Sequence, residues 1–140
     1  MSDYLTGSLR IASSGLQAES IRMRVVSENL ANAQSTAETP GGDPYQRKLV
    51  SFETVAERLS GSVSVEVARI GRDSTDFRVE HNPGHPAADA DGNVLMPNVN
   101  PIIEMADMRE ANHAYRANLE VFTQARELIT MTIDLMRSRR

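Results

Sequence analysis

The stretch SGLQAESIRMRVVSENLANAQST, residues 14–36, determines how the N-terminal part of the chain folds. Apolar side chains recur through it at alternating steps of four and three, which is typical of a narrow helical stripe that packs against another helix. The stretch then ends with two asparagines, and no apolar face follows. It therefore predicts one long helix that stops near residue 33. Two interleaved series form the stripe: Leu9, Leu16, Met23 and Leu30, and Leu5, Ala12, Glu19 and Val26.

The last 40 residues repeat this design. Pro101 suits the first turn of a helix, where its missing N–H costs nothing, and Arg137 suits the last turn, where the helix dipole favours positive charge. The pattern predicts a helix over residues 102–137 that pairs with the N-terminal helix as an antiparallel coiled coil. Its seam consists of Met108, Tyr115, Phe122, Ile129 and Met136, flanked by Ala111, Leu119, Ala125 and Ile133.

The segment between the two helices has a different character. Residues 35–46 are rich in proline and glycine and predict a loop, whereas the structure type of residues 48–59 stays open. The alternating valines of SVSVEVARI, and the short runs FRVEH and NVLMP, predict strands. The expected fold is α+β, with an N-terminal helix (1–33), a loop and linking segment (34–62), a small β module (63–97) and a C-terminal helix (98–140).

Composition excludes several function classes. The chain has no cysteine, so disulfides, thiolate catalysis and cysteine-ligated zinc are ruled out. Its net charge is −4, and only the terminal RSRR is a basic cluster, which argues against nucleic-acid binding. The start, MSDYLTGSLR, does not resemble a cleaved secretory signal, and no apolar run is long enough to span a membrane. We expect export, if it occurs, to use no cleaved leader.

Few residues suggest chemistry. The segment EHNPGHPAADAD offers His81, His85 and three carboxylates, but its prolines and glycine prevent the helix that would align the two histidines. DADG lacks the first and last ligands of a calcium loop, and Asp91 and Gly92 predict a tight turn instead. We therefore expect no catalytic residue, no metal and no cofactor. The seams favour a structural assembly subunit, with a helical-hairpin adaptor or regulatory protein as the alternative.

Several stretches resemble one known family. SGLQAESIRMRVVSENLANAQST, GGDPYQRKLVSFE and NPGHPAADADGNVLMPNVNPIIEMADMREANHAYRANLEVFTQARELI are similar, in order, to segments of the FlgC family of flagellar basal-body rod proteins. PYQRK, PGHPAADADG and MPNVN, followed by EMADM and AYRAN, carry most of this resemblance. It departs at Gln46, Asn93 and Glu19, where the family more commonly has arginine, an aromatic residue and glutamine.

The resemblance implies a non-enzymatic subunit of the proximal rod, the drive-shaft segment that crosses the bacterial periplasm, transmits torque and houses the export channel. It implies export by the flagellar type III apparatus without a cleaved signal. Expected partners are copies of the chain itself, other proximal rod proteins, the distal rod subunit, a basal-body adaptor and, during secretion, the export apparatus. No nucleic acid and no direct membrane insertion are expected.

The resemblance also suggests roles for individual residues. Four amides at the helix ends should form the junction with the β module: Asn29, Asn32, Asn98 and Asn100. Short amides here, and not charges, are expected to connect each helix to that module, and for Asn29 and Asn32 simple capping of the helix end and a contact with another subunit are equally expected. The expected assembly interface is Leu5, Leu9, Leu16, Met23, Val26, Leu30, Met108, Tyr115, Leu119, Phe122, Ile129, Ile133 and Met136.

Overall fold

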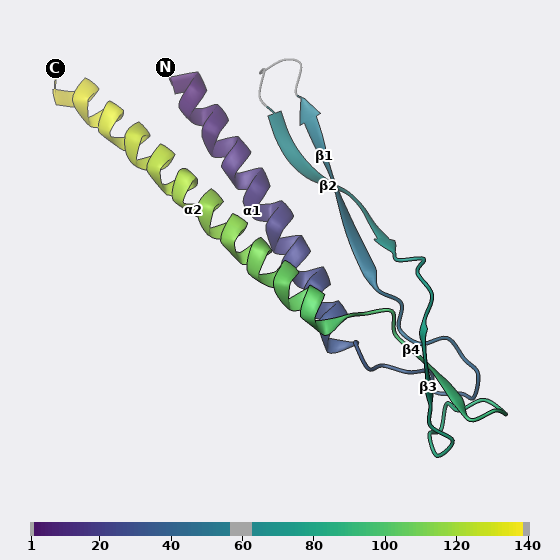
Figure 1. Cartoon of the computed structure of the whole chain (residues 1–140). Helices are drawn as coiled ribbons and strands as arrows, with labels where there is room; N and C mark the ends of the chain where they lie inside the picture. The colour runs from purple at the N-terminus through teal and green to yellow at the C-terminus, as the bar shows by residue number, and fades with distance from the viewer. Residues whose placement is uncertain (1, 57–62, 139–140) are drawn as a thin grey trace. The chain divides into compact units, whose positions relative to one another are not determined.

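A computed structural model describes residues 2–56 and 63–138 (Figure 1). The elements in chain order are α1 (Ser2–Ala31), β1 (Lys48–Ala56), β2 (Val63–Arg72), β3 (Arg78–His81), β4 (Asn93–Met96) and α2 (Pro101–Ser138). The predicted α+β fold is confirmed, and α2 lies within one residue of its predicted bounds at each end. The segment whose type was open forms strand β1, and its last residues, 57–59, lie outside the described residues.

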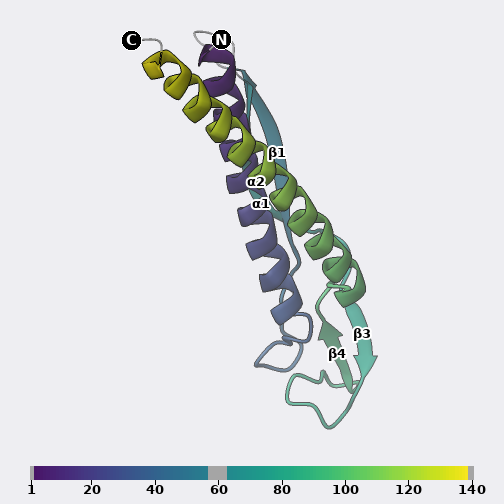
Figure 2. The same cartoon turned by 90° about the vertical axis from the view of Figure 1, so that its left-hand side faces the viewer.

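The chain divides into two compact units, and both helices contribute to each. Unit 1 holds residues 1–22, 52–68 and 110–140, and unit 2 holds residues 23–51 and 69–109. Within unit 1, α1 and α2 run side by side in opposite directions (Figure 2). Gly15 of α1 lies against Asn118 of α2. Arg22, which comes later in α1, pairs with Glu110, which comes earlier in α2. The predicted antiparallel pairing is therefore present.

The most buried apolar side chains of unit 1 are small. Its fully buried apolar residues, among those described, are all alanines: Ala12, Ala18, Ala111 and Ala125. Each alanine buries little area, so each contributes much less than a buried leucine or valine, which is worth about 1.5–3 kcal/mol. Unit 1 thus brings the helix backbones close together with a modest gain in hydrophobic free energy.

Strands β3 and β4 form an antiparallel hairpin in unit 2, with Val79 opposite Leu95 and Glu80 opposite Val94. Asp89 shapes the connecting loop, because its Oδ1 accepts the backbone N–H groups of Asp91 (2.9 Å) and Asn93 (2.8 Å). The predicted turn at Asp91 and Gly92 is present, and Gly92 has a φ of 79°, which side chains disfavour. Valines, alanines and two prolines form the buried apolar set of this unit: Val25, Val26, Ala33, Pro44, Ala87, Val94, Pro97 and Val99.

Asparagines set the helix ends in unit 2. Asn32 follows α1, and its Nδ2 donates back to the Glu28 carbonyl (2.8 Å), while its Oδ1 accepts from Ser35 Oγ (3.0 Å). Asn100 caps α2, because its Oδ1 accepts the Ile102 N–H (3.0 Å) and Pro101 occupies the first helical position. None of the helices in the described part of the chain combines the length and apolar character needed to cross a bilayer.

Alanine substitutions at Gly15 and at Gly7 test the contact between the two helices at Gly15. A Cβ on Gly15 would lie 2.8 Å from the Asn118 amide, which is held by a 3.1 Å bond to the Ala114 carbonyl, whereas a Cβ on Gly7 meets nothing within 4 Å. Gly7→Ala should therefore gain the helix propensity of alanine, about 0.5–1 kcal/mol. Gly15→Ala should instead lower the free energy of unfolding, measured by urea denaturation followed by circular dichroism. Equal gains for both variants would contradict the close helix contact.

Candidate functional site

Asn29 is the centre of a buried polar cluster in unit 2. It is 1% exposed, and all four of its amide hydrogen-bonding positions are used. Its Nδ2 donates to the Lys48 carbonyl (2.9 Å) and to Glu104 Oε2 (3.1 Å), and its Oδ1 accepts from the Lys48 N–H (2.8 Å) and the Tyr45 hydroxyl (2.9 Å). A single side chain of α1 thus binds the start of β1 and the first turn of α2.

Glu104 is fully buried in the first turn of α2, where the helix dipole favours its charge. Its Oε1 accepts from Arg47 Nε at 2.5 Å. The guanidinium of Arg47 also pairs with Asp73 (3.4 Å) and Asp107 (3.5 Å). Burial by itself lowers the pKa of Arg47, but hydrogen bonds and opposite charges, from Glu104 and then Asp73, outweigh it and raise the pKa. The cluster therefore holds one partly buried cation among three carboxylates.

Asn98 joins the segment before α2 to the same cluster. Its Oδ1 accepts the Arg47 N–H (2.8 Å), and its Nδ2 donates to the carbonyls of Asp73 (3.1 Å) and Thr75 (3.0 Å). Gln46 Nε2 donates to the Asp73 carbonyl at 2.7 Å. The pKa of Asp73 is lowered, chiefly because its carboxylate accepts the Thr75 backbone N–H, with smaller contributions from Arg47.

Amides are not the only groups that connect the helices to the segment before β1. The amides of Asn29 and Asn98 do make hydrogen bonds in this cluster. The ion pair between Arg47 and Glu104 belongs to the same cluster. No pairing role was predicted from the sequence for either Glu104 or Arg47. A signal existed, because Glu104 stands seven residues before Ala111 on the seam of α2, where a carboxylate requires a buried partner.

The residues of the expected assembly interface fall into three groups. Val26 is buried, and Leu30, Leu119, Ile133 and Met136 are exposed. The others are half-buried: Leu5, Leu9, Leu16, Met23, Met108, Tyr115, Phe122 and Ile129.

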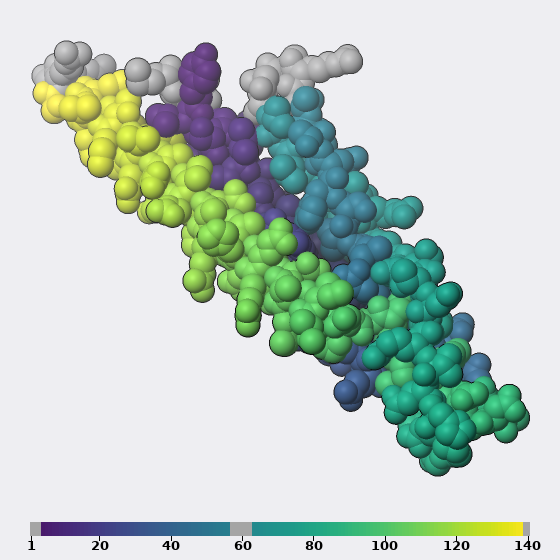
Figure 3. All heavy atoms as spheres, in the orientation of Figure 1, coloured from purple at the N-terminus to yellow at the C-terminus, as the bar shows by residue number. Residues whose placement is uncertain are grey.

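Large apolar side chains remain exposed along α2 in unit 1. The space-filling view shows the yellow-green surface of residues 110–138 without a covering segment on this face (Figure 3). A monomeric protein seldom exposes so many large apolar side chains on one element unless they mark an interaction site. The exposed members of this surface are Leu119, Val121, Leu128, Met131, Ile133, Leu135 and Met136.

Glu19 lies in the seam of unit 1 as an incompletely paired carboxylate. Its Oε2 is buried and has no hydrogen-bond partner in the described part of the chain, and its nearest cation, Arg22, is 3.7 Å away. Burial raises the pKa of Glu19, Arg22 counteracts this, and Glu110 raises the pKa further.

The residues considered for metal binding either make other hydrogen bonds or do not lie together as metal ligands would. His85 Nδ1 accepts the Ala87 N–H (3.1 Å), and Asp89 shapes its own loop as described above. Within residues 2–56 and 63–138, no three His, Asp or Glu side chains are grouped as metal ligands would be.

Substitution of Glu104 tests the buried cluster. Glu104→Gln keeps the size of the side chain but removes the charge that Arg47 Nε contacts, so the free energy of unfolding should fall by about 1.5–3 kcal/mol. Glu120→Gln, at an exposed position of the same helix, should change it by less than about 0.5 kcal/mol. Urea denaturation of both variants measures the difference, and comparable values would show that the buried pair contributes little.

Substitution of Glu19 tests the effect of an incompletely paired carboxylate on stability. Because its pKa is raised in the folded state above the ordinary 4.5, ionisation of Glu19 opposes folding as the pH rises through that folded-state pKa. Glu19→Gln should therefore stabilise the chain at pH 7 and have little effect below pH 4.5. Urea denaturation of both proteins at each pH gives the difference. A stabilisation that is the same at both pH values would exclude ionisation as its cause.

The chain is similar in sequence to known proteins. Residues 9–37 match the family described as flagella basal body rod protein, and residues 90–135 match the one described as flagellar basal body rod FlgEFG protein C-terminal. The chain is 54% identical to the flagellar basal-body rod protein FlgC of Agrobacterium fabrum, over 97% of this chain and 98% of the relative. It is 38% identical to that of Salmonella typhimurium (89% and 92%) and 34% identical to that of Bacillus subtilis (91% and 95%).

These relatives match nearly the full length of the chain, including the segments that supply Asn29, Arg47 and Glu104 to the buried cluster. The two family matches cover most of α1 and most of α2. The resemblance seen in the sequence is therefore confirmed: the chain belongs to the FlgC family of flagellar basal-body rod proteins and is a structural subunit of the rod, which assembles with other rod components.

Proposed function

We propose that the chain is a subunit of the proximal rod and that neighbouring subunits cover the exposed apolar surface of its α2 helix. The observation that carries this proposal is the contrast within unit 1, where alanines fill the buried contact while large apolar side chains of α2 stay exposed. Burying one such side chain fully is worth about 1.5–3 kcal/mol. Neighbours in a rod would therefore supply a large part of the stabilisation that unit 1 lacks.

The half-buried seam residues have a related role in the proposal. Leu16, Met23, Tyr115 and Phe122 are partly covered within the single chain and would be covered further by packing against adjacent subunits. Narrow apolar stripes on long helices require such partner helices. Copies of the chain, other proximal rod proteins, the distal rod subunit and a basal-body adaptor are the proposed neighbours.

The location of the chain follows from the same proposal. As part of the rod, the subunit would cross the periplasm, transmit torque and contribute to the wall of the export channel. It would reach this place through the flagellar export apparatus without a cleaved signal. The small size of the fully buried apolar side chains of unit 1 supports this route, because a modest free energy of folding makes passage through a narrow channel less costly.

A charge on the exposed surface of α2 tests the proposal. Leu119 is 45% exposed, so Leu119→Glu should leave the helix content of the chain unchanged but prevent its incorporation into the rod. Cells that depend on the variant should then swim no better than cells without the gene. Val79→Glu, an equivalent change at a 63% exposed position of β3, should retain motility.

Two measurements separate assembly from folding in this experiment. Circular dichroism of the purified variant reports its helix content, and immunoblots of isolated basal bodies report its incorporation. Normal amounts of folded Leu119→Glu protein in basal bodies would refute the proposal that neighbours cover this surface.

A further inference from the structure

Glu19 lies in the contact between α1 and α2 within unit 1, at a position of the seam that suits an apolar side chain. Ala12, seven residues earlier on the same helix face, is buried, and Gly15, about one turn earlier, lies against Asn118 of α2. The Glu19 side chain is 16% exposed, and its Oε2 is buried without a hydrogen-bond partner in the described part of the chain. Ionisation of this carboxyl is costly, because water does not solvate the buried oxygen.

The cation beside Glu19 is shared with a second carboxylate. Arg22 Nη2 donates a hydrogen bond to Glu110 Oε2 (3.2 Å), whereas its Nη1 lies 3.7 Å from Glu19 Oε2, too far for a hydrogen bond. Burial raises the pKa of Glu19, Arg22 lowers it, Glu110 raises it again, and the net result is a raised pKa. Arg22 therefore compensates only in part for the burial of Glu19.

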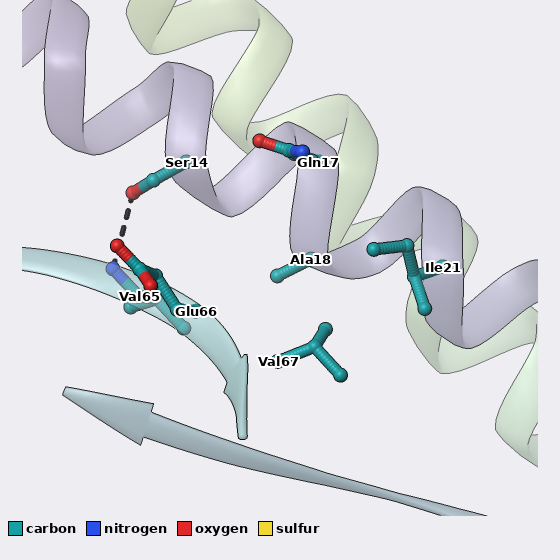
Figure 4. Close-up of a pocket in the computed structure, with 7 residues that line it drawn as sticks. All are labelled: Ser14, Gln17, Ala18, Ile21, Val65, Glu66 and Val67. Carbon is teal, nitrogen blue, oxygen red and sulfur yellow. Dashed lines mark hydrogen bonds between the residues drawn. The ribbon is translucent and has the colours of Figure 1, made fainter. Parts of the chain in front are cut away.

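The opposite side of α1 faces β2. Ile21 projects nearly opposite to Glu19, because two residues turn a helix by about 200°. It lies in a groove between α1 and β2 (Figure 4), and among the described residues that line this groove Glu66 is the charged one. The charged groups that act on Glu19 are thus Arg22 of α1 and Glu110 of α2.

The cost of burying Glu19 falls on a contact with little apolar burial to offset it. The fully buried apolar side chains of unit 1, among the residues described, are alanines. Unit 2 does not share this cost, because its buried carboxylate, Glu104, is paired with Arg47 and hydrogen-bonded to Asn29. Proteins open locally where stabilising contacts are few, so unit 1 can open while unit 2 stays folded.

We propose that ionised Glu19 causes the contact between α1 and α2 in unit 1 to open locally and reversibly, and that protonation of Glu19 favours the closed contact. Opening exposes the paired faces of both helices, so pH controls how readily a free chain exchanges this contact for one with another helix. The inference concerns the free chain and does not rest on its location in the rod.

The direction of the pH dependence follows from the two states of Glu19. In the open state the carboxyl is in water and has its ordinary pKa of 4.5, whereas in the closed state its pKa is higher. The closed state therefore binds the proton more tightly, and it loses stability as the pH rises through that higher pKa. Below pH 4.5 the carboxyl is protonated in both states, so the penalty disappears.

Hydrogen exchange of the purified chain, followed by mass spectrometry of its peptides, measures this opening region by region. Protection is the exchange rate of an unstructured peptide divided by the observed rate at the same pH. The wild-type chain is compared from pH 7 to pH 4.5 with Glu19→Gln and with Glu120→Gln, a control at an exposed position of α2. Peptides from residues 24–31 and 102–109 of unit 2 serve as an internal reference.

At pH 7, Glu19→Gln should raise the protection of residues 12–22 and 110–125 about tenfold, because an uncharged amide is less costly to bury. The protection of unit 2 should change by less than about twofold, as should that of every region in Glu120→Gln. As the pH falls to 4.5, the protection of unit 1 in the wild-type chain should rise to within about twofold of that in Glu19→Gln.

Equal or lower protection of unit 1 in Glu19→Gln at pH 7 would overturn the proposal. A tenfold increase that persists at pH 4.5 would also overturn it, because ionisation would not be the cause, and an equal increase in both units would show that the opening is not local. Exchange of unit 1 as fast as in an unstructured chain, in both proteins, would overturn it as well, because Glu19 would have no closed contact to open.

Discussion

The buried carboxylate of Glu104 is the constraint on which unit 2 depends. A charge removed from water is costly unless it is paired and fully hydrogen-bonded, and Glu104 meets that condition only when Arg47 and Asn29 are both in place. Arg47 immediately precedes β1, and Asn29 lies in the last turns of α1. Pairing of this single group therefore fixes the end of one helix, the start of the other and the strand beside them.

Unit 1 is held together in a different way. Its alanines permit close approach of the helices, and Gly15 lies against the Asn118 amide, but these side chains bury little apolar area. Close contacts of this kind define which faces meet, while large apolar residues on other faces remain available. The same helices thus carry a polar, locally satisfied arrangement in unit 2 and an apolar, incompletely covered arrangement in unit 1.

Periodicity was sufficient to predict the elements but not the cluster that joins them. The helical seams and the alternation of Val63, Val65 and Val67 are local patterns, and the helices and the strand that they predict are present. The strand β1 has no such pattern, because most of its residues are exposed and do not alternate. The Arg47–Glu104 pair joins residues 57 positions apart, and no local rule relates them.

The motifs that carried the family resemblance gain a physical explanation from the cluster. ENLANA supplies Asn29, PYQRK supplies Tyr45 and Arg47, MPNVN supplies Asn98, and EMADM begins with Glu104. Each of these side chains bonds to another motif of the set. The motifs are therefore parts of one buried network, in which replacing any member leaves a polar group without its partner. Such a network requires a specific set of residues, whereas an apolar seam tolerates exchange among residues of similar size, so short polar motifs identify this fold more sharply than its long helices do.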